Sequence, residues 1–300
     1  MSKIALLFAG QGAQSVGMCS DLYEHFACAR EIFDSSPETR DMIMAGPKEL
    51  LDVTINTQPA MFLADLACAA VLTESGFRAQ GAAGFSLGEI PAACYAGLMT
   101  QAQAFDLVKH RAAKMQECSE KRGGCMFAVL KLDDIVVESI CRSLGQAYPA
   151  NYNCPGQLVV ACADDCAEKL QQEVSGSGGK ALKLAVSGAF HSPFMDDAAK
   201  AMAAFLESRS FGQPGMPLYA NATAQVYGDP KELLAGQVNS PVLWRMTIEN
   251  MIADGFDTFI EAGPGKTLSG LVRKICSDAT VCNVSDLASL AHTLEMLEKR

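Results

Sequence analysis

The sequence predicts an α/β fold in which a domain with a parallel sheet is interrupted by a small inserted subdomain. Short apolar, β-branched runs alternate with longer helical patterns in the first 119 residues and again after residue 188. This alternation is typical of a parallel sheet whose strands are connected by helices. Between residues 120 and 188 the rhythm changes to strand–helix–strand–strand–helix–strand, which is the order of the ferredoxin-like motif.

The predicted large domain comprises residues 1–119 and 189–300, on either side of the small subdomain at residues 120–188. Its first part is expected to contain strand 4–8, helices 22–33 and 60–72, strand 81–84, and helices 88–95 and 101–116. In the last of these helices, Phe105, Val108 and Ala112 are spaced three and four residues apart. One face of that helix must therefore be buried.

Turn signals delimit the small subdomain. Gly123 and Gly124 precede its first strand, and a glycine-rich run at residues 175–179 precedes its last. The expected elements are strand 126–130, helix 133–143, strands 150–153 and 158–162, helix 164–174 and strand 180–184. The large domain then resumes with helix 195–207, strand 217–219, helix 244–253, strand 256–261 and a final helix from residue 285.

Length, composition and charge narrow the function classes. The chain has 300 residues, of which 49% are apolar and 19% charged, so it can bury roughly three quarters of its unfolded surface. Disordered and fibrous proteins are thereby excluded. The net charge is −10 and the sequence has no basic stripe. We therefore expect no nucleic acid partner, because a phosphate backbone would repel such a chain.

No segment for export or membrane insertion is predicted. The apolar stretch between Lys3 and Gly10 is too short for a signal peptide. We find no window of roughly 18 apolar residues, the length needed to cross a membrane. The sequence therefore predicts a cytoplasmic protein with no membrane partner.

The twelve cysteines are scattered singly through apolar patterns, and none forms a C-x-x-C pair. In a cytoplasmic protein this spacing predicts reduced thiols that fill the core. The chain has only four histidines, and Cys162 and Cys166 are four residues apart. This arrangement does not favour a zinc site, and we expect no metal.

The segment Gly84-Phe85-Ser86-Leu87-Gly88 predicts a nucleophilic serine. It fits the pattern G-x-S-x-G, follows a predicted strand of small residues and precedes a predicted helix, which is the context of a nucleophile elbow. The glycines let the backbone turn sharply, and the start of the helix offers N–H groups to an oxyanion. The alternative is a Gly-Ser turn that only caps the helix.

A serine nucleophile needs a base, and four histidines are candidates. His25, His110 and His292 fall in amphipathic or charged helix patterns, where surface or packing roles are typical. His191 instead lies in a predicted loop, just before a helix that Ser192 is placed to cap. It is the predicted base, and a structural histidine beside a helix cap is the alternative.

A second glycine-rich turn follows the first predicted strand. Gly10-Gln11-Gly12 would bring a main-chain N–H to the edge of a parallel sheet, where ligands collect. Gln11 could in this way complete an oxyanion hole. A plain glycine turn explains this short motif equally well.

Together with further motifs, these segments resemble the malonyl-coenzyme A:acyl carrier protein transacylases and the related acyltransferase domains of polyketide and fatty acid synthases. The resemblance spans nearly the whole chain. The matching segments are 10–14 (GQGAQ), 57–60 (TQPA), 84–89 (GFSLGE), Arg111 with Met115 and Gln116, 153–157 (NCPGQ), 188–192 (GAFHS), Gln237 with 239–242 (NSPV) and Trp244, and 263–268 (GPGKTL).

The resemblance implies an α/β-hydrolase-like large domain that carries a ferredoxin-like small subdomain, in agreement with the pattern of elements. It implies that Ser86 is the nucleophile, that His191 is its general base, and that the main-chain carbonyl of Gln237 orients the histidine. The oxyanion hole would consist of the main-chain N–H groups of Gln11 and Leu87, each worth roughly 3 kcal/mol in the transition state.

Further residues are expected to contact the acyl group, by the same resemblance. They are Arg111, Phe190, Phe85, Met115 and Asn153. Arg111 would bind the free carboxylate of malonate as a bidentate pair. The helix periodicity places this arginine on an apolar face, where a charge needs a partner. Phe190 would crowd a 2-methyl branch and favour malonyl over methylmalonyl groups.

One position departs from the family. Phe85, directly before the nucleophile, stands where the family usually has histidine. An apolar ring thus replaces one that can form hydrogen bonds. Since Ser86 and His191 are present, we expect activity to be retained, with an altered rate or acyl selectivity.

The predicted function is ping-pong transfer of malonyl from malonyl-CoA onto Ser86, and then onto the phosphopantetheine thiol of holo acyl carrier protein. No metal or redox cofactor is expected. The transfer would supply extender units for fatty acid synthesis; the alternative is a discrete acyltransferase that serves a polyketide synthase. A serine thioesterase or hydrolase would use the late His292 instead. A non-catalytic carrier-binding protein would need neither Ser86 nor His191.

We also expect a monomer with a local basic patch, since the carrier is typically acidic. The residues considered for this patch are Lys183, Lys266, Arg273 and Lys274.

Overall fold

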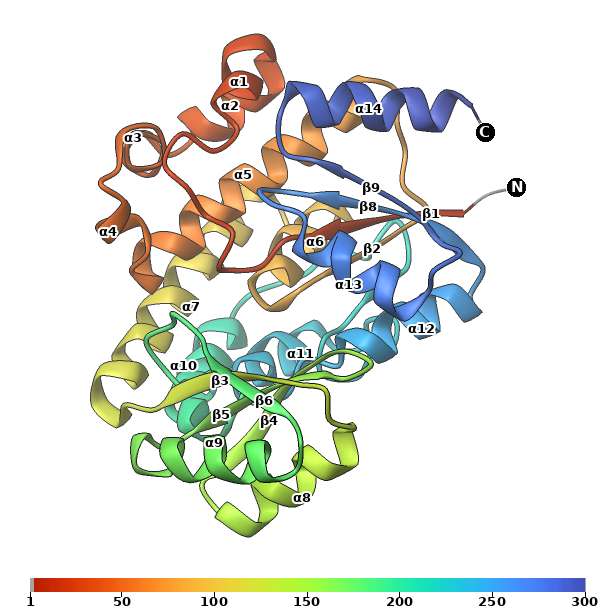
Figure 1. The fold of residues 1–300 in the computed structure, drawn as a ribbon. Helices are drawn as coiled ribbons and strands as arrows, with labels where there is room; N and C mark the ends of the chain where they lie inside the picture. The colour runs from red at the N-terminus through yellow and green to blue at the C-terminus, as the bar shows by residue number, and fades with distance from the viewer. Residues whose placement is uncertain (1–2, 300) are drawn as a thin grey trace. The chain divides into compact units, whose positions relative to one another are not determined.

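The computed structural model describes residues 3–299 and divides into two compact units, each with its own sheet (Figure 1). The first unit holds the described residues as far as Ala112, the segment Phe211–Tyr219 and the chain from Met251 onward. The second unit holds Ala113–Ser210 and Ala220–Asn250. It contains the whole of the subdomain predicted at residues 120–188 and extends beyond it on both sides.

The first unit is built on a five-stranded parallel sheet, in the order β7-β2-β1-β8-β9. Its strands are β1 (Lys3–Phe8), β2 (Gly81–Gly84), β7 (Leu218–Tyr219), β8 (Phe256–Ala262) and β9 (Thr280–Val284). The central strand β1 pairs in parallel with β2 and with β8. This confirms the predicted α/β class, although the edge strand β9 was not predicted.

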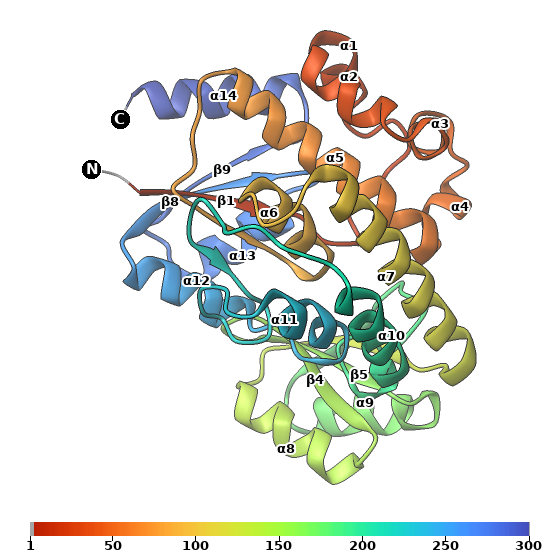
Figure 2. The ribbon, with the colours of Figure 1, turned by 180° about the vertical axis from the view of Figure 1, so that it is seen from behind.

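Helices cover both faces of this sheet, and others pack against those helices. The helices of the first unit are α1 (Ser20–His25), α2 (Ala27–Asp34), α3 (Pro37–Ala45), α4 (Lys48–Leu51), α5 (Thr54–Glu74), α6 (Glu89–Tyr95), the first part of α7 (Gln101–Arg122), α13 (Thr267–Ile275) and α14 (Leu287–Glu298). Figures 1 and 2 show α6 and α13 on opposite faces. The prediction of one helix over residues 22–33 was wrong, because Phe26 is extended, with φ −117° and ψ 128°, and separates α1 from α2. The helices α3, α4 and α13 were not predicted.

The long helix α5 is a core element of the first unit. It begins six residues before the predicted helix 60–72 and contains Pro59 within its second turn. By length and composition α5 could cross a membrane, which contradicts the expectation that the chain has no such window. However, 83% of that window is buried inside the protein. Its apolar surface therefore packs against protein, as in a core helix.

The second unit is built on a four-stranded antiparallel sheet, in the order β4-β5-β3-β6. Its strands are β3 (Cys125–Leu130), β4 (Ala147–Cys154), β5 (Gln157–Cys162) and β6 (Lys180–Lys183). Its helices are α8 (Asp134–Leu144), α9 (Ala167–Gly176), α10 (Asp196–Glu207), α11 (Pro230–Gly236) and the first part of α12 (Trp244–Ala253). The strand order is that of the ferredoxin-like fold, as predicted, whereas α11 was not predicted.

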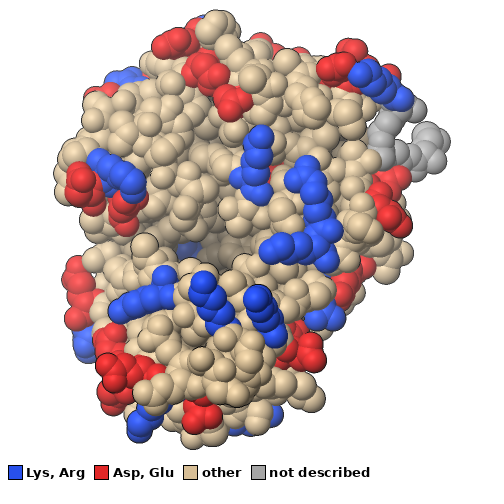
Figure 3. All heavy atoms as spheres, viewed as in Figure 1, with Lys and Arg blue, Asp and Glu red and all other residues tan. Residues whose placement is uncertain are grey.

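Figure 3 shows where the charged side chains lie on the protein surface. In the first unit, basic side chains gather over α13, although the chain carries a net charge of −10. Lys266, Arg273 and Lys274 are exposed at α13, and Lys183 is exposed in β6. Basic side chains are thus locally concentrated in an acidic protein.

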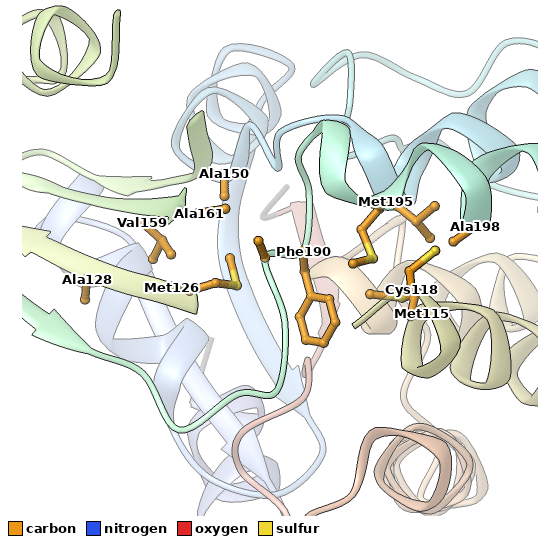
Figure 4. Close-up of a cluster of buried hydrophobic side chains, with 12 residues drawn as sticks. Met115, Cys118, Met126, Ala128, Ala150, Val159, Ala161, Phe190, Met195 and Ala198 are labelled. Atoms are coloured by element: carbon orange, nitrogen blue, oxygen red, sulfur yellow. The ribbon is translucent and has the colours of Figure 1, made fainter. Parts of the chain in front are cut away.

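Both faces of the antiparallel sheet are buried, which explains the extent of the second unit. Along β3, Phe127 and Val129 face a cluster that includes Val137 of α8 and Leu170 of α9. The alternate residues face a second cluster, drawn in Figure 4, whose buried members are Met115, Cys118, Met126, Ala128, Ala150, Val159, Ala161, Ala189, Phe190, Met195, Ala198 and Val238. The end of α7, α10 and the segment around Val238 therefore pack on the sheet as part of one core.

The cysteines all lie among the described residues and carry free thiols, and eight of the twelve are buried. Two pairs are in contact. The Sγ atoms of Cys19 and Cys68 are 3.6 Å apart, and those of Cys125 and Cys162 are 3.7 Å apart. Both distances exceed the roughly 2.05 Å of a disulfide bond, so these side chains act as core thiols.

Candidate active site

The predicted site residues fall into two groups, one in each unit. In the first unit, Ser86 lies at a sharp turn from β2 into the short 3-10 helix η1 (Ser86–Gly88), which continues into α6. Its φ is 52°, in the left-handed region. A Cβ atom on Gly88 would collide with the carbonyl oxygen of Phe8, and one on Gly84 would collide with the carbonyl of Gly88. The strained serine therefore depends on both glycines of the motif.

The turn that contains Gln11 lies beside the serine turn. A Cβ atom on Gly10 would come within 2.7 Å of the carbonyl oxygen of Phe85. The N–H of Phe85 in turn donates to the carbonyl of Phe8, at 3.0 Å. Leu87 is buried in the first turn of the helical segment, where main-chain N–H groups point away from the helix. Gln11 is partly buried, and its side-chain Nε2 is 3.4 Å from Thr54 Oγ1.

The side chain of Arg111, in α7, extends to the hydroxyl group of Ser86. Its side chain is only 1% exposed. Nη2 donates a hydrogen bond to Ser86 Oγ at 3.2 Å, and Nη1 donates one to Gln58 Oε1 of α5 at 2.8 Å. The guanidinium is thus directed at the hydroxyl oxygen by an amide on a neighbouring core helix.

The charge of Arg111 is held in a buried setting. Burial lowers the pKa of its guanidinium to about 10, and the nearby Glu89 acts in the opposite direction. Glu89 is itself 1% exposed. Because this pKa lies well above neutrality, the guanidinium stays protonated at pH 7 and presents a positive charge beside Ser86.

In the second unit, the main chain holds His191. Its side chain is 4% exposed, and its φ is 58°. Nδ1 lies 3.0 Å from the carbonyl oxygen of Gln237 and 3.1 Å from that of Ser240. Carbonyl oxygens only accept, so Nδ1 carries a hydrogen, and in the neutral tautomer the acceptor lone pair of the ring is on Nε2.

The segments on both sides of this histidine are fixed by hydrogen bonds. The N–H of His191 donates to the carbonyl of Val238 at 3.0 Å. Ser192 caps the short helix η3 (Pro193–Met195), since its Oγ accepts from the N–H of Phe194. Asn239 Nδ2 donates to Asp196 Oδ1 at 2.9 Å. The loop that supplies the carbonyl groups is in this way tied to the start of α10.

Three residues expected to contact an acyl group also lie in this unit. Phe190 and Met115 are buried in the cluster of Figure 4, where the Phe190 ring lies near the side chain of Met115 and the sulfur atoms of the neighbouring core residues. Phe190 thus contributes to the core, whatever its effect on selectivity. Asn153 of β4 is 6% exposed, and its Oδ1 has no hydrogen-bond partner among the described residues.

The remaining histidines are unlike His191. His25 and His292 are exposed on α1 and α14, and His110 is partly buried on α7. An exposed side chain on a helix is poorly suited to act as a catalytic base. Among residues 3–299, moreover, no group of three or more His, Cys, Asp or Glu side chains is arranged to hold a metal ion.

Three contacts were not predicted from the sequence. They are the amide of Gln58 on Arg111, the buried charge of Glu89 near the same guanidinium, and the second carbonyl on His191, from Ser240. Each of these residues lies in a segment that matched the family motifs. The family motifs identify the segments in which these residues lie. Which side chain each residue contacts depends on packing between distant parts of the chain.

Comparison with known proteins gives consistent matches over the full length. The sequence model of the acyl transferase domain family matches residues 5–292. The chain is 35% identical to the malonyl CoA-acyl carrier protein transacylase of Bacillus subtilis, over 100% of this chain and 98% of that protein.

Solved structures show the same fold. The malonyl CoA-acyl carrier protein transacylase of Clostridium perfringens superposes with a TM-score of 0.95 at 37% identity, over 99% of this chain and 98% of that one. A malonyl-transacylase solved in complex with its type II polyketide synthase acyl carrier protein gives a TM-score of 0.94 at 33% identity, over 98% and 99% of the two chains.

Proposed function

Because the chain belongs to the acyl transferase domain family, we propose that it transfers malonyl from malonyl-CoA to the phosphopantetheine thiol of holo acyl carrier protein. One observation carries this proposal. The buried Arg111 donates a hydrogen bond to Oγ of the strained Ser86. A cation suited to a free carboxylate therefore lies directly at a nucleophile turn.

In the first half-reaction, Ser86 Oγ attacks the thioester carbonyl of malonyl-CoA. The Oγ–C bond forms, the C–S bond breaks, and the serine proton passes through His191 to the departing coenzyme A thiolate. The main-chain N–H groups of Gln11 and Leu87 stabilise the oxyanion between these events. The strained φ of Ser86 supports its role as the nucleophile, because this conformation holds the hydroxyl at the tip of the turn.

In the second half-reaction, the phosphopantetheine thiol attacks the malonyl-serine ester. His191 takes the thiol proton and returns it to Ser86 Oγ as the ester bond breaks. The carbonyl groups of Gln237 and Ser240 support this role, since they accept from Nδ1 and leave Nε2 to receive the proton. They also stabilise the imidazolium while it is charged.

Selectivity for malonyl rests on Arg111. The malonyl carboxylate lies one methylene beyond the ester carbonyl, short enough to fold back to a guanidinium that contacts Oγ. An acetyl group has no charge to pair with it, so the two acyl groups are discriminated by about 3–5 kcal/mol at most, the cost of leaving a buried charge unpaired. Asn153 Oδ1, which has no hydrogen-bond partner among the described residues, would accept from a substrate donor, and Met115, Phe190 and Phe85 would contribute apolar surface.

The proposed partners follow from the chemistry. The carrier is a holo acyl carrier protein. It docks through basic side chains, for which the candidates are Lys183, Lys266, Arg273 and Lys274, all of them exposed. The enzyme acts as a cytoplasmic monomer, without a metal or redox cofactor and without nucleic acid or membrane partners. The malonyl units enter fatty acid synthesis. The complex of a related transacylase with a polyketide synthase carrier makes polyketide synthesis the second candidate pathway.

The test follows the acyl group by intact-protein mass. The parent chain and Ser86→Ala are mixed with malonyl-CoA, and holo acyl carrier protein is then added. We expect a malonyl adduct on the parent chain only, followed by its transfer to the carrier. Carriers of a fatty acid and a polyketide synthase, compared in parallel, distinguish the two pathways by rate.

Two other outcomes would contradict the proposal. An adduct that is released only as free malonate would indicate a hydrolase. Absence of any adduct on the parent chain would exclude Ser86 as an acyl acceptor and overturn the transacylase function itself.

A further inference from the structure

Gln58 presents a neutral acceptor to the guanidinium that faces the nucleophile. It lies in α5 and is fully buried. Its Oε1 is 2.8 Å from Arg111 Nη1. A guanidinium can only donate, so the amide oxygen, and not the amide nitrogen, must face it. The contact fixes both the side-chain amide and the rotation of the guanidinium plane.

The fixed plane directs the second arm of the fork. With Nη1 on Gln58, Nη2 points at Ser86 Oγ, 3.2 Å away. The bond to Ser86 uses a lone pair of the hydroxyl and leaves its hydrogen for a base. The side chain of Gln58 therefore sets the position of the cation relative to the atom that becomes acylated.

The neutrality of this acceptor matters as much as its position. Glu89 already supplies one buried negative charge near Arg111. An amide oxygen orients the guanidinium without cancelling its charge, whereas a carboxylate of the same shape would form a buried ion pair with it. The charge that remains available to an acyl carboxylate thus depends on position 58 being an amide.

We propose that Gln58 is a positioning residue that sets the charge selectivity of the enzyme, because it orients Arg111 while leaving its positive charge available to a carboxylate-bearing acyl group. This inference rests on the proposed function and deepens it. It predicts that an amide-to-carboxylate change, isosteric with Gln58, weakens loading of charged acyl groups far more than loading of neutral ones.

The experiment compares malonyl-CoA with acetyl-CoA as donors to Ser86. Initial rates of adduct formation are measured by intact-protein mass over a range of donor concentrations, to give kcat and KM for each. In Gln58→Glu we expect the malonyl-over-acetyl preference to fall by roughly 100-fold, the scale set by loss of a buried charge pairing. The change should come from malonyl, while the acetyl rate stays the same or rises. Loss of structure alone would lower both rates together.

Two further variants make the test decisive. Gln171→Glu, at an exposed position of α9, controls for the added charge and should keep the parent preference. Gln58→Leu removes the acceptor without adding charge, and should lower the preference by about tenfold, through KM for malonyl-CoA. Thermal unfolding is measured for each variant, and Gln58→Leu decides the question if Gln58→Glu does not fold.

The outcomes separate this inference from the proposed function. A parent chain that loads malonyl, with an unchanged preference in a folded Gln58→Glu or Gln58→Leu variant, would overturn the role of Gln58 alone. A parent chain that loads no malonyl would overturn the transacylase function, and this inference with it.

Discussion

The two units hold their key side chains by different means, although Ser86 and His191 share an uncommon backbone conformation, with φ of 52° and 58°. Around Ser86 the main chain is packed so closely that glycine is required at several points. Around His191, hydrogen bonds from its ring and its N–H reach main-chain carbonyl groups about fifty residues later in the chain.

This difference assigns a separate physical task to each unit. Close packing fixes where the nucleophile stands, because no neighbouring atom can move without a collision. Hydrogen bonds to carbonyl groups fix which nitrogen of the histidine carries the proton. The nucleophile turn should therefore be sensitive to added atoms, and the histidine site should be sensitive mainly to loss of the ring.

The largest expected effect is the loss of that ring. His191→Ala should lower the rate of malonyl adduct formation by a factor on the order of 10,000, because no other group takes the serine proton. His25→Ala, on the exposed surface of α1, should load at the parent rate. Rapid-quench mass spectrometry of both variants checks this. A loss below tenfold in His191→Ala would place the base elsewhere.

The same difference explains which parts of the site could be read from the sequence. The serine turn is local, so the spacing of Gly84, Ser86 and Gly88 predicted it directly, together with the strand before it and the helix after it. His191 was selected by elimination among four histidines, and its loop was correctly placed. The second carbonyl, from Ser240, could not be foreseen, because main-chain contacts 49 residues apart leave no mark on residue type.

The fold shows a similar division. All four strands of the antiparallel sheet were predicted: β3 and β5 read as short apolar runs, and the turn signals around them delimit β4 and β6. Of the elements that escaped prediction, α4 has only four residues, whereas β9 and α13 carry apolar residues whose pattern was not recognised. The break at Phe26 was hidden because apolar residues continue through it in a helical pattern. The length of α5 was underestimated: the helix begins at Thr54 and contains Pro59, a residue that usually interrupts a helix interior.

Substitution of one glycine in each unit tests whether added atoms destabilise the serine turn more than the loop that contacts His191. Gly88→Ala should lower the free energy of unfolding by at least about 4 kcal/mol, because its Cβ would collide with the carbonyl oxygen of Phe8. Gly236→Ala is the matched control beside Gln237. There the nearest atom, Ser240 Oγ, would be 3.9 Å from the new Cβ, so the change should be neutral or slightly stabilising. Equal losses in urea unfolding would contradict the contrast.

The close packing of the first unit also buries a carboxyl group. Asp65 of α5 lies against Gly263, where a Cβ atom would collide with its Oδ1. Neither carboxyl oxygen has a hydrogen-bond partner among the described residues. Burial raises the pKa of Asp65 well above its ordinary value of 3.8, and Cys68 and Glu261 act in the same direction.

The sign of the resulting pH dependence follows from proton binding. The folded protein keeps a proton on Asp65 that the unfolded chain releases above about pH 4, so stability falls as the pH rises, by about 1.4 kcal/mol per pH unit while the folded carboxyl stays protonated. Asp65→Asn, neutral at every pH, should unfold at a higher temperature than the parent at pH 8 and converge with it toward pH 4. The exposed Asp165→Asn controls for loss of a carboxyl group. A difference that is constant with pH would show that Asp65 is ionised in the folded protein.

The smallest effect is expected at Phe85, where the main chain and the side chain have separate tasks. The N–H of Phe85 donates to Phe8, and its carbonyl accepts from the N–H of Gly88 at 2.9 Å. These bonds build the turn whatever ring is attached. Phe85→His should therefore keep the free energy of unfolding within about 1.5 kcal/mol and the malonyl loading rate within roughly tenfold. Loading of malonyl-CoA and acetyl-CoA, measured side by side with thermal unfolding, checks this. Complete loss of loading in a folded variant would mean that the ring itself, and not only the packed main chain, holds Ser86 in its reactive position.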